Sequence, residues 1–465
     1  MPPSAVPDPA TVFLEALWCG LGGEPQAMER VIYVPGPDLP SVFATSALGA
    51  ASVAAVGLAA AELVAAAGHA APSASIDWRR TALWFQSSIA PQGWQIPPIW
   101  DAVAGDYATA DGWIRLHTNA AHHRAAALRA LGLDADADRA RVAVAVGAWS
   151  GTSLEAAVVA EGGVAAQMRS LADWRVHPQG AAVAAEPQFH LHQQAGGRPD
   201  DAPLDPARPL AGVKVLDLTR ILAGPIATRA LAGLGAQVLR LDPPGWDEPS
   251  VAPDVTLGKR CARLDLKSAA GRARFLDLLA QADVVIQGYR PSALDALDLG
   301  AAVRQAARPG LIDIALDAYG WTGPWAGRRG YDSLVQMSAG IARAGMCWRG
   351  ADRPFPLPVQ ALDHATGYAL AAAALRGLAE RRRTGAGLRA FTSLAKTADL
   401  LTRVAATPAA APFPKPRAED YQSALEQTEW GPAHRLKAPL KLGGRRLQWD
   451  RPAGRLGSSD AVWLG

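Results

Sequence analysis

The feature that most constrains the fold is a succession of short apolar strands alternating with helices after residue 209. Val213–Leu218 is typical of a strand, Gly224 and Pro225 open a helix that runs to about Leu234, and Gln237–Leu241 is typical of a second strand. Proline is favoured at the first helical position because its missing N–H would have no intrahelical partner there. This order indicates a βαβ unit, and such units build a parallel sheet with right-handed crossovers.

The same alternation continues along the chain. A helix is expected over 269–280, and further strands are expected at 283–287 and 311–316. The order predicts an α/β fold with a Rossmann-like parallel sheet. The first βα turn, residues 219–225, lacks the three-glycine pattern that lets a dinucleotide pyrophosphate approach the backbone, which argues against NAD or FAD.

The rest of the 465-residue chain divides by composition. An Ala-rich helix over 45–68 and a small α/β domain lie within residues 1–185, and residues 186–208, rich in Pro, Gly, Gln and Asp, are predicted to be a linker. Residues 209–403 form the Rossmann-like domain, and residues 404–465 are a C-terminal tail. Within the first region the patterns predict a strand at 75–78, a helix at 79–86, strands at 100–107 and 112–118 around a hairpin turn, and helices over 121–185.

Composition narrows the classes of function. Hydrophobic residues make up 49% and charged residues 19% of the chain, which is ordinary for a globular protein, and a net charge of +3 is too small to indicate nucleic-acid binding. The three cysteines are far apart, so neither a disulfide framework nor a structural zinc site is expected. The uncharged run at 45–61 is mostly Ala, Gly and Ser, which favours a buried helix over a membrane span. We therefore expect a cytoplasmic protein without nucleic-acid or membrane partners and without a bound metal.

Histidines offer no clear site in the sequence. His122 and His123 are adjacent, so on a helix they point to different sides and make a poor metal pair. The histidines before residue 200 are all interpreted as structural or surface residues.

One carboxylate stands at a place that suits chemistry. Asp363 precedes a long Ala-rich helix, which reads as helix over 368–380 and ends in basic residues and glycines at 381–387. Asp363 could be a helix N-cap, whose side chain accepts from free N–H groups, or it could be a nucleophile. The local sequence leaves both interpretations open.

The chain also contains an internal repeat. Residues 45–82 and 361–398 both read as a small-residue helix, a glycine break and a short strand, and they end in Arg80-Thr-Ala82 and Lys396-Thr-Ala398. Aligning Thr81 with Thr397 places Asp363 opposite the segment 45–49, near residue 47, where no carboxylate stands. The chain is therefore predicted to hold two related helix–strand pieces, of which one has the aspartate.

Several segments after residue 209 together carry a family resemblance. In order they are Leu210–Thr219, Ala223–Pro225, Leu264–Lys267, Ala282–Pro291, Tyr319–Pro324, Gly330–Gln336, and Asp363 followed by Arg383–Gly387. In this order they resemble the class III coenzyme A transferases of the CaiB/BaiF type, the group of formyl-CoA transferase and carnitine CoA-transferase. The α-methylacyl-CoA racemases share the fold.

The resemblance implies a function and a set of site residues. It implies transfer of coenzyme A between an acyl-CoA thioester and a carboxylic acid, with Asp363 as the nucleophile that forms an aspartyl anhydride and then an aspartyl-CoA thioester. Acyl-CoA is a substrate in this chemistry, no cofactor is held permanently, and a homodimer is expected. We place oxyanion donors among the N–H groups near His364 and Ala365. The implied CoA contacts are Leu222, Ala223, Leu264, Asp265, Leu266, Lys267, Gly288, Tyr289, Arg290, Arg329, Gly330, Tyr331 and Asp332. Of these, Lys267, Arg290 and Arg329 are candidate phosphate partners, and Tyr289 is a candidate for stacking on adenine.

The order of parts departs from the family. A small-domain-like region, about 95–185, precedes the Rossmann half, so the chain resembles a transferase with rearranged halves: residues 1–185 are a degenerate second-half-like region, and residues 404–465 return to the small domain. Leu222 stands where formyl-CoA transferase has Gln, Gly288 stands where Asn is usual, and the Gly-rich shielding loop has no counterpart. Oxalate and formate are therefore not favoured as substrates.

Two alternatives remain open. A racemase-like epimerase needs a His in a Gly-His-Asp motif as its second acid/base, and here the motif is Gly330-Tyr331-Asp332; tyrosine has a much higher reference pKa. A catalytically inactive CoA-binding paralogue would explain the degenerate first copy, although the aspartate is retained.

Overall fold

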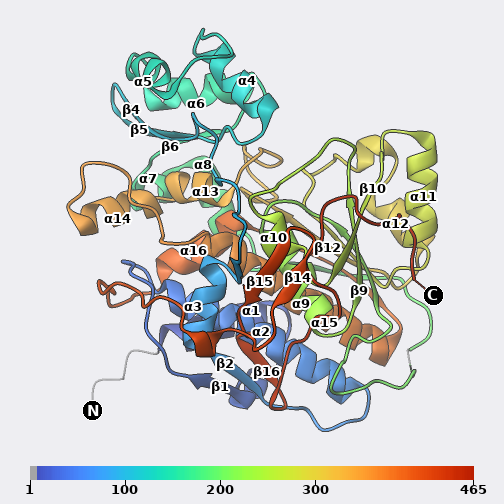
Figure 1. The fold of residues 1–465 in the computed structure, drawn as a ribbon. Helices are drawn as coiled ribbons and strands as arrows, with labels where there is room; N and C mark the ends of the chain where they lie inside the picture. The colour runs from blue at the N-terminus through green and yellow to red at the C-terminus, as the bar shows by residue number, and fades with distance from the viewer. Residues whose placement is uncertain (1–7, 200, 465) are drawn as a thin grey trace.

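A seven-stranded sheet forms the centre of the molecule in the computed structural model, which describes residues 8–199 and 201–464 (Figure 1). Its strands follow the order β10-β9-β8-β11-β12-β13-β7. In that order they are Lys259–Arg263, Gln237–Asp242, Lys214–Leu218, Val284–Gln287, Ile312–Asp317, Gly387–Ser393 and His190–Gln194. β8 pairs with β9 in parallel, which confirms the predicted βαβ unit. Six strands are parallel, and β7 is antiparallel to β13 at the edge.

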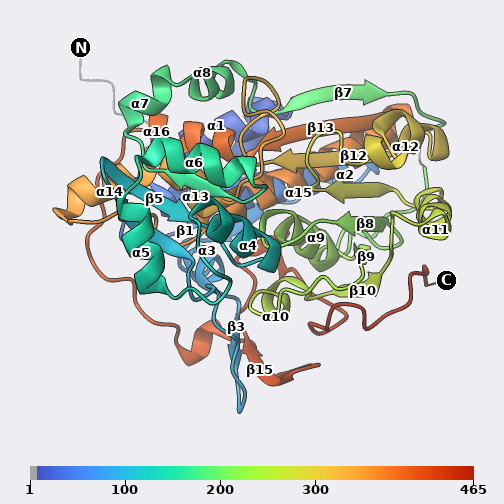
Figure 2. The same ribbon diagram turned by 90° about the horizontal axis from the view of Figure 1, so that it is seen from above.

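Helices cover both faces of this sheet because alternate residues of each strand face opposite sides. Val215 and Val284 join the apolar core that holds α9 (Ala223–Gly233) and α15 (Ala361–Thr384). Their neighbours Leu216 and Val285 join a second core with α11 (Ala269–Leu279), beside which α12 (Ala301–Ala307) lies. Figure 2 shows α9 and α15 behind the strands and α11 and α12 at one end of the sheet. Strands buried on both faces read as continuous apolar runs, which is why this half was predictable.

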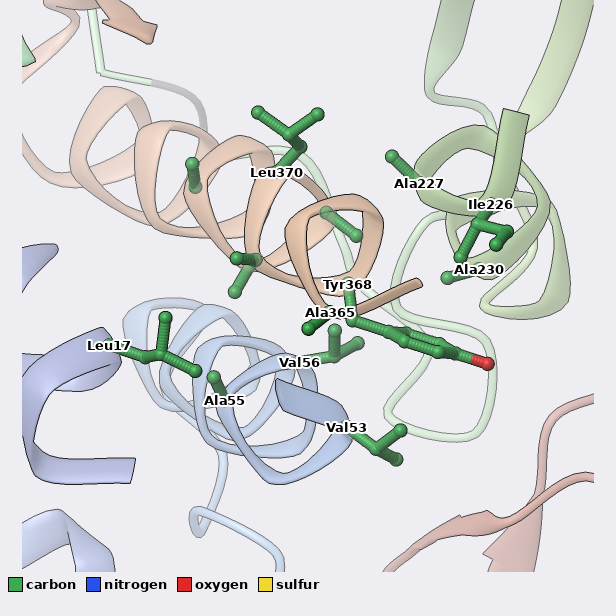
Figure 3. Packing of buried hydrophobic residues seen from close by; sticks show 14 of the residues in the cluster. Leu17, Val53, Ala55, Val56, Ile226, Ala227, Ala230, Ala365, Tyr368 and Leu370 are labelled. Carbon is green, nitrogen blue, oxygen red and sulfur yellow. The ribbon is translucent and has the colours of Figure 1, made fainter. Parts of the chain in front are cut away.

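The Ala-rich helix α2 (Thr45–Ala66) packs along α15 and is a core helix. It is long and apolar enough to cross a membrane, but 94% of its most apolar window is buried inside the fold. Figure 3 shows Val53 and Val56 of α2 and Ala230 of α9 gathered around Tyr368 of α15. Small side chains on these helices let the backbones approach closely, so three helices share one core with little space between them.

The two halves of the predicted repeat share element order and helix-start geometry. The first half contains β1 (Val31–Val34), α2, β2 (Ala74–Asp77) and α3 (Trp78–Gln86), and the second half contains β12, α15, β13 and α16 (Leu394–Arg403) in the same order. In each half the two strands pair in parallel. The residue before each helix has the same unusual backbone, with φ −74° and ψ 56° at Ala44 and φ −76° and ψ 64° at Gln360. The first turn of α2 has no acidic residue, as expected from the alignment.

A small unit sits apart from the sheet and forms the upper lobe of Figure 1. It consists of the antiparallel sheet β4-β5-β6 and three helices with their own apolar core. The elements are β4 (Gly105–Thr109), β5 (Gly112–Leu116), α4 (Ala121–Ala130), α5 (Arg139–Gly147), α6 (Gly151–Ala160) and β6 (Ala165–Gln167). The predicted strand at 100–107 is thus wrong for 100–104, and the predicted all-helical 121–185 contains β6, which the short apolar run after α6 forms by pairing with β5. α7 (Leu171–Val176) and α8 (Pro178–Ala185) lead back to the sheet.

The predicted linker and tail need correction. Residues 186–208 include β7. This polar segment can form a strand because an edge strand pairs with only one neighbour, which here is β13. In the tail, β14 (Glu426–Thr428) and β15 (Gly431–Arg435) form a sheet with β3 (Ile89–Pro91), and β16 (Leu440–Leu442) pairs with β2 and with β17 (Arg445–Arg446). The tail's strands therefore pair with residues 74–91 and not with the small unit, so the predicted return to the small domain is wrong.

The remaining elements complete the description. They are α1 (Pro9–Gly20), α10 (Ala252–Val255), α13 (Asp332–Ser338), α14 (Ile341–Arg349), and short 3-10 turns at Pro25–Arg30, Asp295–Leu297 and Ala418–Asp420.

Candidate active site

The sheet has a topological switch point between β8 and β11. From β8 the chain proceeds outward to β9 and β10, and it then returns to β11 on the other side of β8. Ligands of open α/β sheets bind at such a point, outside the carboxyl ends of the strands. The turn after β8, residues 219–222, and the turn after β11, residues 288–292, therefore frame the candidate site, and both contain residues that the sequence implicated.

The turn after β8 holds an arginine that the sequence analysis missed. Arg220 lies 5.0 Å from the ring centroid of Trp246 and 4.9 Å from that of Tyr289, and it donates a 2.7 Å hydrogen bond to the Tyr289 hydroxyl. Two aromatic rings thus hold one guanidinium at the switch point. Its position in the first βα turn was visible in the sequence, but its two aromatic partners come from other loops.

The backbone beside Arg220 is strained, and a buried carboxylate holds it in this conformation. Ile221 has φ 64°, a left-handed conformation that is unfavourable for a β-branched residue. Its N–H donates to Glu248 at 2.9 Å, and Glu248 is itself paired with Arg240 beneath the turn. Strain of this kind persists where surrounding contacts impose it, and it is concentrated at functional sites.

The structure brings many of the predicted CoA contacts to this edge of the sheet. Leu222 is the N-cap of α9 and Ala223 its first residue. Leu264, Leu266 and Tyr289 pack against one apolar cluster. Asp265 accepts the Lys267 N–H at 3.0 Å in the exposed turn after β10. Gly288 follows β11 directly, and Gly330 packs under Tyr319 and Ala318.

Arg290 and Arg329 form the cationic part of this edge. The pKa of Arg329 is lowered by burial and by the nearby charge of Arg290. Two guanidinium groups that repel each other in this way form a place for an anion.

Asp363 is not the N-cap of α15. The helix begins at Ala361 after Gln360, and Asp363 stands in its first turn with its side chain only 8% exposed. The structure therefore contradicts the interpretation of Asp363 as a cap.

A second carboxylate takes over that capping role. Asp332, at the start of α13, accepts the N–H of Asp363 at 2.9 Å and also the N–H of Leu362. Gln336 donates to the other oxygen of Asp332 and accepts the Leu357 N–H at 2.7 Å. Asp332 was predicted as a CoA contact; in the structure it is a buried partner of the helix that presents Asp363.

The expected oxyanion donors at His364 and Ala365 are not free. The His364 N–H donates to Gln360 at 3.1 Å within the first helical turn, and Ala365 lies one residue further inside the helix. The His364 ring stacks on Phe85 at 4.5 Å, and burial lowers its pKa to about 3. Because the helix start is already capped by Asp332, donors for substrate oxygens must come from elsewhere.

Burial and like charge perturb the two aspartates together. Burial is the main cause that raises the pKa of Asp363 well above its ordinary value, and the charge of Asp332 adds to it. Burial raises the pKa of Asp332 to about 6, although its hydrogen bonds oppose the shift. A carboxylate with a raised pKa is more basic and a better nucleophile, and paired carboxyls of this kind are common at active sites.

The small unit also reaches this place, which sequence reasoning missed. His117, directly after β5, stacks on Tyr331 with ring centroids 3.9 Å apart and an interplanar angle of 7°. His123 of α4 contacts the same ring edge-on at 6.1 Å. Of the two interpretations given to these histidines, structural or surface, the surface one does not hold, because both are buried. No local pattern could reveal it, since the partner ring is more than 200 residues away in the sequence.

The arrangement provides a buried, basic carboxylate beside a loop edge rich in cations. In residues 8–199 and 201–464, no group of three or more His, Cys, Asp or Glu side chains is placed to hold a metal ion.

Comparison with known proteins identifies the region that contains this site. Residues 210–433 match the CoA-transferase family III profile. The chain is 36% identical over 210 residues to an acetyl-coenzyme A transferase of Hypoxylon pulicicidum, covering 43% of this chain and 35% of that protein. It is 34% identical over 207 residues to human succinyl-CoA:glutarate CoA-transferase, covering 41% and 46%.

Matches to solved structures cover the same share of the chain. A structure of a Mycobacterium tuberculosis protein aligns with 32% identity and a TM-score of 0.39, over 42% of this chain and 57% of that one. A CaiB/BaiF family protein of Brucella suis aligns with 30% identity and a TM-score of 0.37. The chain spans between about a third and a half of the length of these curated relatives. By profile and by sequence, residues 210–433 of this chain are similar to CoA-transferase family III.

Proposed function

We propose that this protein transfers coenzyme A between an acyl-CoA thioester and a carboxylic acid, with Asp363 as the nucleophile. The observation that carries the proposal is the state of Asp363, a nearly buried carboxylate whose pKa is raised by burial and by Asp332. Its helix packs through Gly367 against Ala223, directly after the turn at the switch point of the sheet. Relatives with this family region are named acetyl-CoA, succinyl-CoA and fatty acyl-CoA transferases, which supports the same class of reaction here.

The chemistry proceeds through exchange at two carbonyl carbons. A carboxylate oxygen of Asp363 attacks the thioester carbon. The C–S bond breaks, CoA departs as a thiolate, and a mixed anhydride between Asp363 and the acyl group remains. The thiolate then attacks the aspartyl carbonyl, which releases the first acid and forms an aspartyl-CoA thioester. The acceptor carboxylate attacks that thioester, expels the thiolate again and forms a second anhydride, and thiolate attack on its acyl carbon gives the new acyl-CoA and restores Asp363. The route requires no net proton transfer. Its covalent intermediates divide one difficult exchange into several easier steps.

Coenzyme A would lie along the carboxyl edge of the sheet. Arg220, Arg290 and Arg329 provide charge for its phosphates, and the apolar surface of Leu264, Leu266 and Tyr289 suits its adenine. The homodimer and the cytoplasmic location stay predictions from the sequence.

The epimerase alternative is not favoured by the site. It needs a second base opposite Asp363, and Tyr331 occupies that position with its pKa raised to about 12 by burial. His117, whose ring stacks on Tyr331, has its pKa lowered to about 3, mainly by burial, so it stays uncharged and a weak base.

Trapping the enzyme-bound acyl group tests the proposal. Purified protein is incubated with acetyl-CoA or succinyl-CoA and hydroxylamine, and peptides are analysed by mass spectrometry. We expect an aspartyl hydroxamate at Asp363 and CoA exchange into an added carboxylic acid. Asp363→Asn should lose both, whereas Asp298→Asn, at an exposed left-handed position that Asn tolerates, should keep both.

The result also separates the three candidate functions. Epimerase activity would appear as exchange of the α-proton into deuterated solvent without CoA transfer. An inactive paralogue would bind CoA with neither reaction. Transfer that survives Asp363→Asn would reject the proposed nucleophile.

A further inference from the structure

The His117–Tyr331–His123 cluster holds polar atoms without partners. Among residues 8–199 and 201–464, Nδ1 of His117 and both ring nitrogens of His123 have no hydrogen-bond partner, although the two residues are only 7% and 3% exposed. A buried polar group left unpaired costs about 1–3 kcal/mol, so native proteins rarely keep several in one place without a role. These nitrogens are suited to a ligand that brings its own acceptors.

The cluster is connected to Asp363 through two adjacent residues: Asp332 accepts the Asp363 N–H at 2.9 Å, and the ring of Tyr331 carries both histidines. Tyr331 is close enough to Asp363 for its pKa to respond to that charge, and both histidine rings pack on Tyr331. A group that reaches the two histidines would therefore be at the far end of an acyl chain whose carbonyl meets Asp363.

The charge around the cluster favours an anion at that far end. Burial, the neighbouring His122 and the charge of Arg329 lower the pKa of His123, and the Arg329 charge also acts on Tyr331. Its guanidinium donates only to the Gly162 carbonyl at 3.1 Å, and within residues 8–199 and 201–464 it forms no ion pair. The pKa of His123 is lowered to about 4, so the ring is a neutral donor at physiological pH, able to bind a carboxylate without a second positive charge.

We propose that His117 and His123 form an acyl subsite that recognises a distal carboxylate, so that the enzyme prefers dicarboxylic acyl groups to monocarboxylic ones of equal length. This deepens the proposed function and rests on it. The small unit would thereby set acyl specificity, while Asp363 and the sheet edge carry out the transfer.

Binding of two isosteric CoA thioethers tests the subsite without any reaction. One carries a 3-carboxypropyl group and the other a butyl group, and affinities are measured by calorimetry with the full chain. We expect the carboxylate form to bind about tenfold or more tightly, as one charge-assisted hydrogen bond can provide. His117→Phe and His123→Phe, which keep the ring packing on Tyr331 but remove the donors, should each reduce this preference, and the double variant should bring the two ligands within about twofold.

Controls separate recognition from folding. His122→Phe changes the exposed neighbour of His123 and should leave the preference intact. Butyl thioether affinity should be unchanged in all variants, which shows that they are folded. The same preference should appear in kcat/KM for succinyl-CoA against butyryl-CoA.

Each outcome has a definite meaning. Equal binding of both thioethers by a protein that transfers CoA would overturn the subsite and keep the proposed function. A preference that persists in the double phenylalanine variant would also overturn it. Failure of both thioethers to bind would reject the proposed function and the subsite with it.

Discussion

At the scale of single residues, the site depends on a pair of buried aspartates that do different work. Asp332 accepts the backbone N–H of Asp363, so it fixes the helix start and at the same time places a negative charge near the proposed nucleophile. Each group raises the cost of ionising the other, because two like charges share a poorly solvated place. The pair therefore titrates as a unit, and in the proposed reaction the reactive form is the one in which Asp363 has lost its proton.

The pH profile of the reaction should report this coupling. We expect the acidic limb of kcat/KM to lie well above the ordinary range of an aspartate in the wild type, because the proposed transfer needs ionised Asp363 and its pKa is raised. Asp332→Asn removes the like charge but keeps an oxygen that can accept the N–H, so the limb should move to lower pH. A profile that stays in place after this substitution would contradict the coupling.

The same burial makes Asp363 costly for stability at neutral pH. Its pKa is raised in the folded state, so the fold binds this proton more tightly than the unfolded chain, and stability is lost as pH rises through the folded-state pKa. We expect Asp363→Asn to raise the free energy of unfolding by at least about 1 kcal/mol at pH 7.5 and to change it little at pH 4, measured by urea denaturation. If Asp363→Asn instead lowers the free energy of unfolding at pH 7.5, then the Asp363 side chain has a stabilising partner.

At the scale of elements, the position of Asp363 is set by how α15 lies against α9. Gly367 stands where a Cβ atom would come within 2.4 Å of the Ala223 carbonyl oxygen and 2.9 Å of Ile226 Cβ. The approach is so close because both helices present small residues to each other. Ala223 begins α9 directly after the turn that holds Arg220, so the packing of two helices links the nucleophile to the candidate CoA site.

An alanine at position 367 should separate these helices. We expect Gly367→Ala to destabilise the protein by about 1–3 kcal/mol, because the methyl group would collide with backbone, and to lower kcat/KM further than the stability loss explains. Gly147→Ala is the matched control: Gly147 also lies in a helix, but its Cβ would meet nothing within 4 Å. Thermal unfolding together with kinetics distinguishes the two, and equal behaviour of both variants would contradict the role of this contact.

At the scale of the whole molecule, segments far apart in sequence close around a buried network of charges. Arg435 of the tail donates to Ser88 at 2.7 Å and pairs with Glu426 at 2.6 Å, and Asp254 bridges it to Arg229 of α9. Residues before 95, the Rossmann half and the tail thus form one body, while the small unit stays a lobe of its own (Figure 1).

Removing the central cation of this network should weaken the whole fold. Arg435 is 1% exposed, and Arg435→Ala leaves two partly buried carboxylates short of compensation, so we expect a loss of about 3–5 kcal/mol in the free energy of unfolding. Arg417→Ala, which breaks an exposed pair with Glu419, should cost no more than about 1 kcal/mol. Denaturant titration measures both, and a small loss for Arg435→Ala would mean that water or a rearranged side chain replaces it.

The sequence by itself determined the Rossmann-like half and the identity of the nucleophile candidate. Strand and helix periodicity is a local property, so the order of β8, α9 and β9 could be predicted without long-range contacts. The family segments and the repeat likewise depend on residues read in order, and both pointed to Asp363 and to an equivalent position without an acid.

Only the tertiary structure decided what surrounds that aspartate. A polar stretch became strand β7 because the sheet edge was open to it, and the tail joined β2 and β3 because those strands offered unpaired edges. Asp332 became the cap of α15, and His117 met Tyr331 across two separate units. Such contacts join residues with no sequence period between them, and their energies depend on burial and distance, which the order of amino acids does not display.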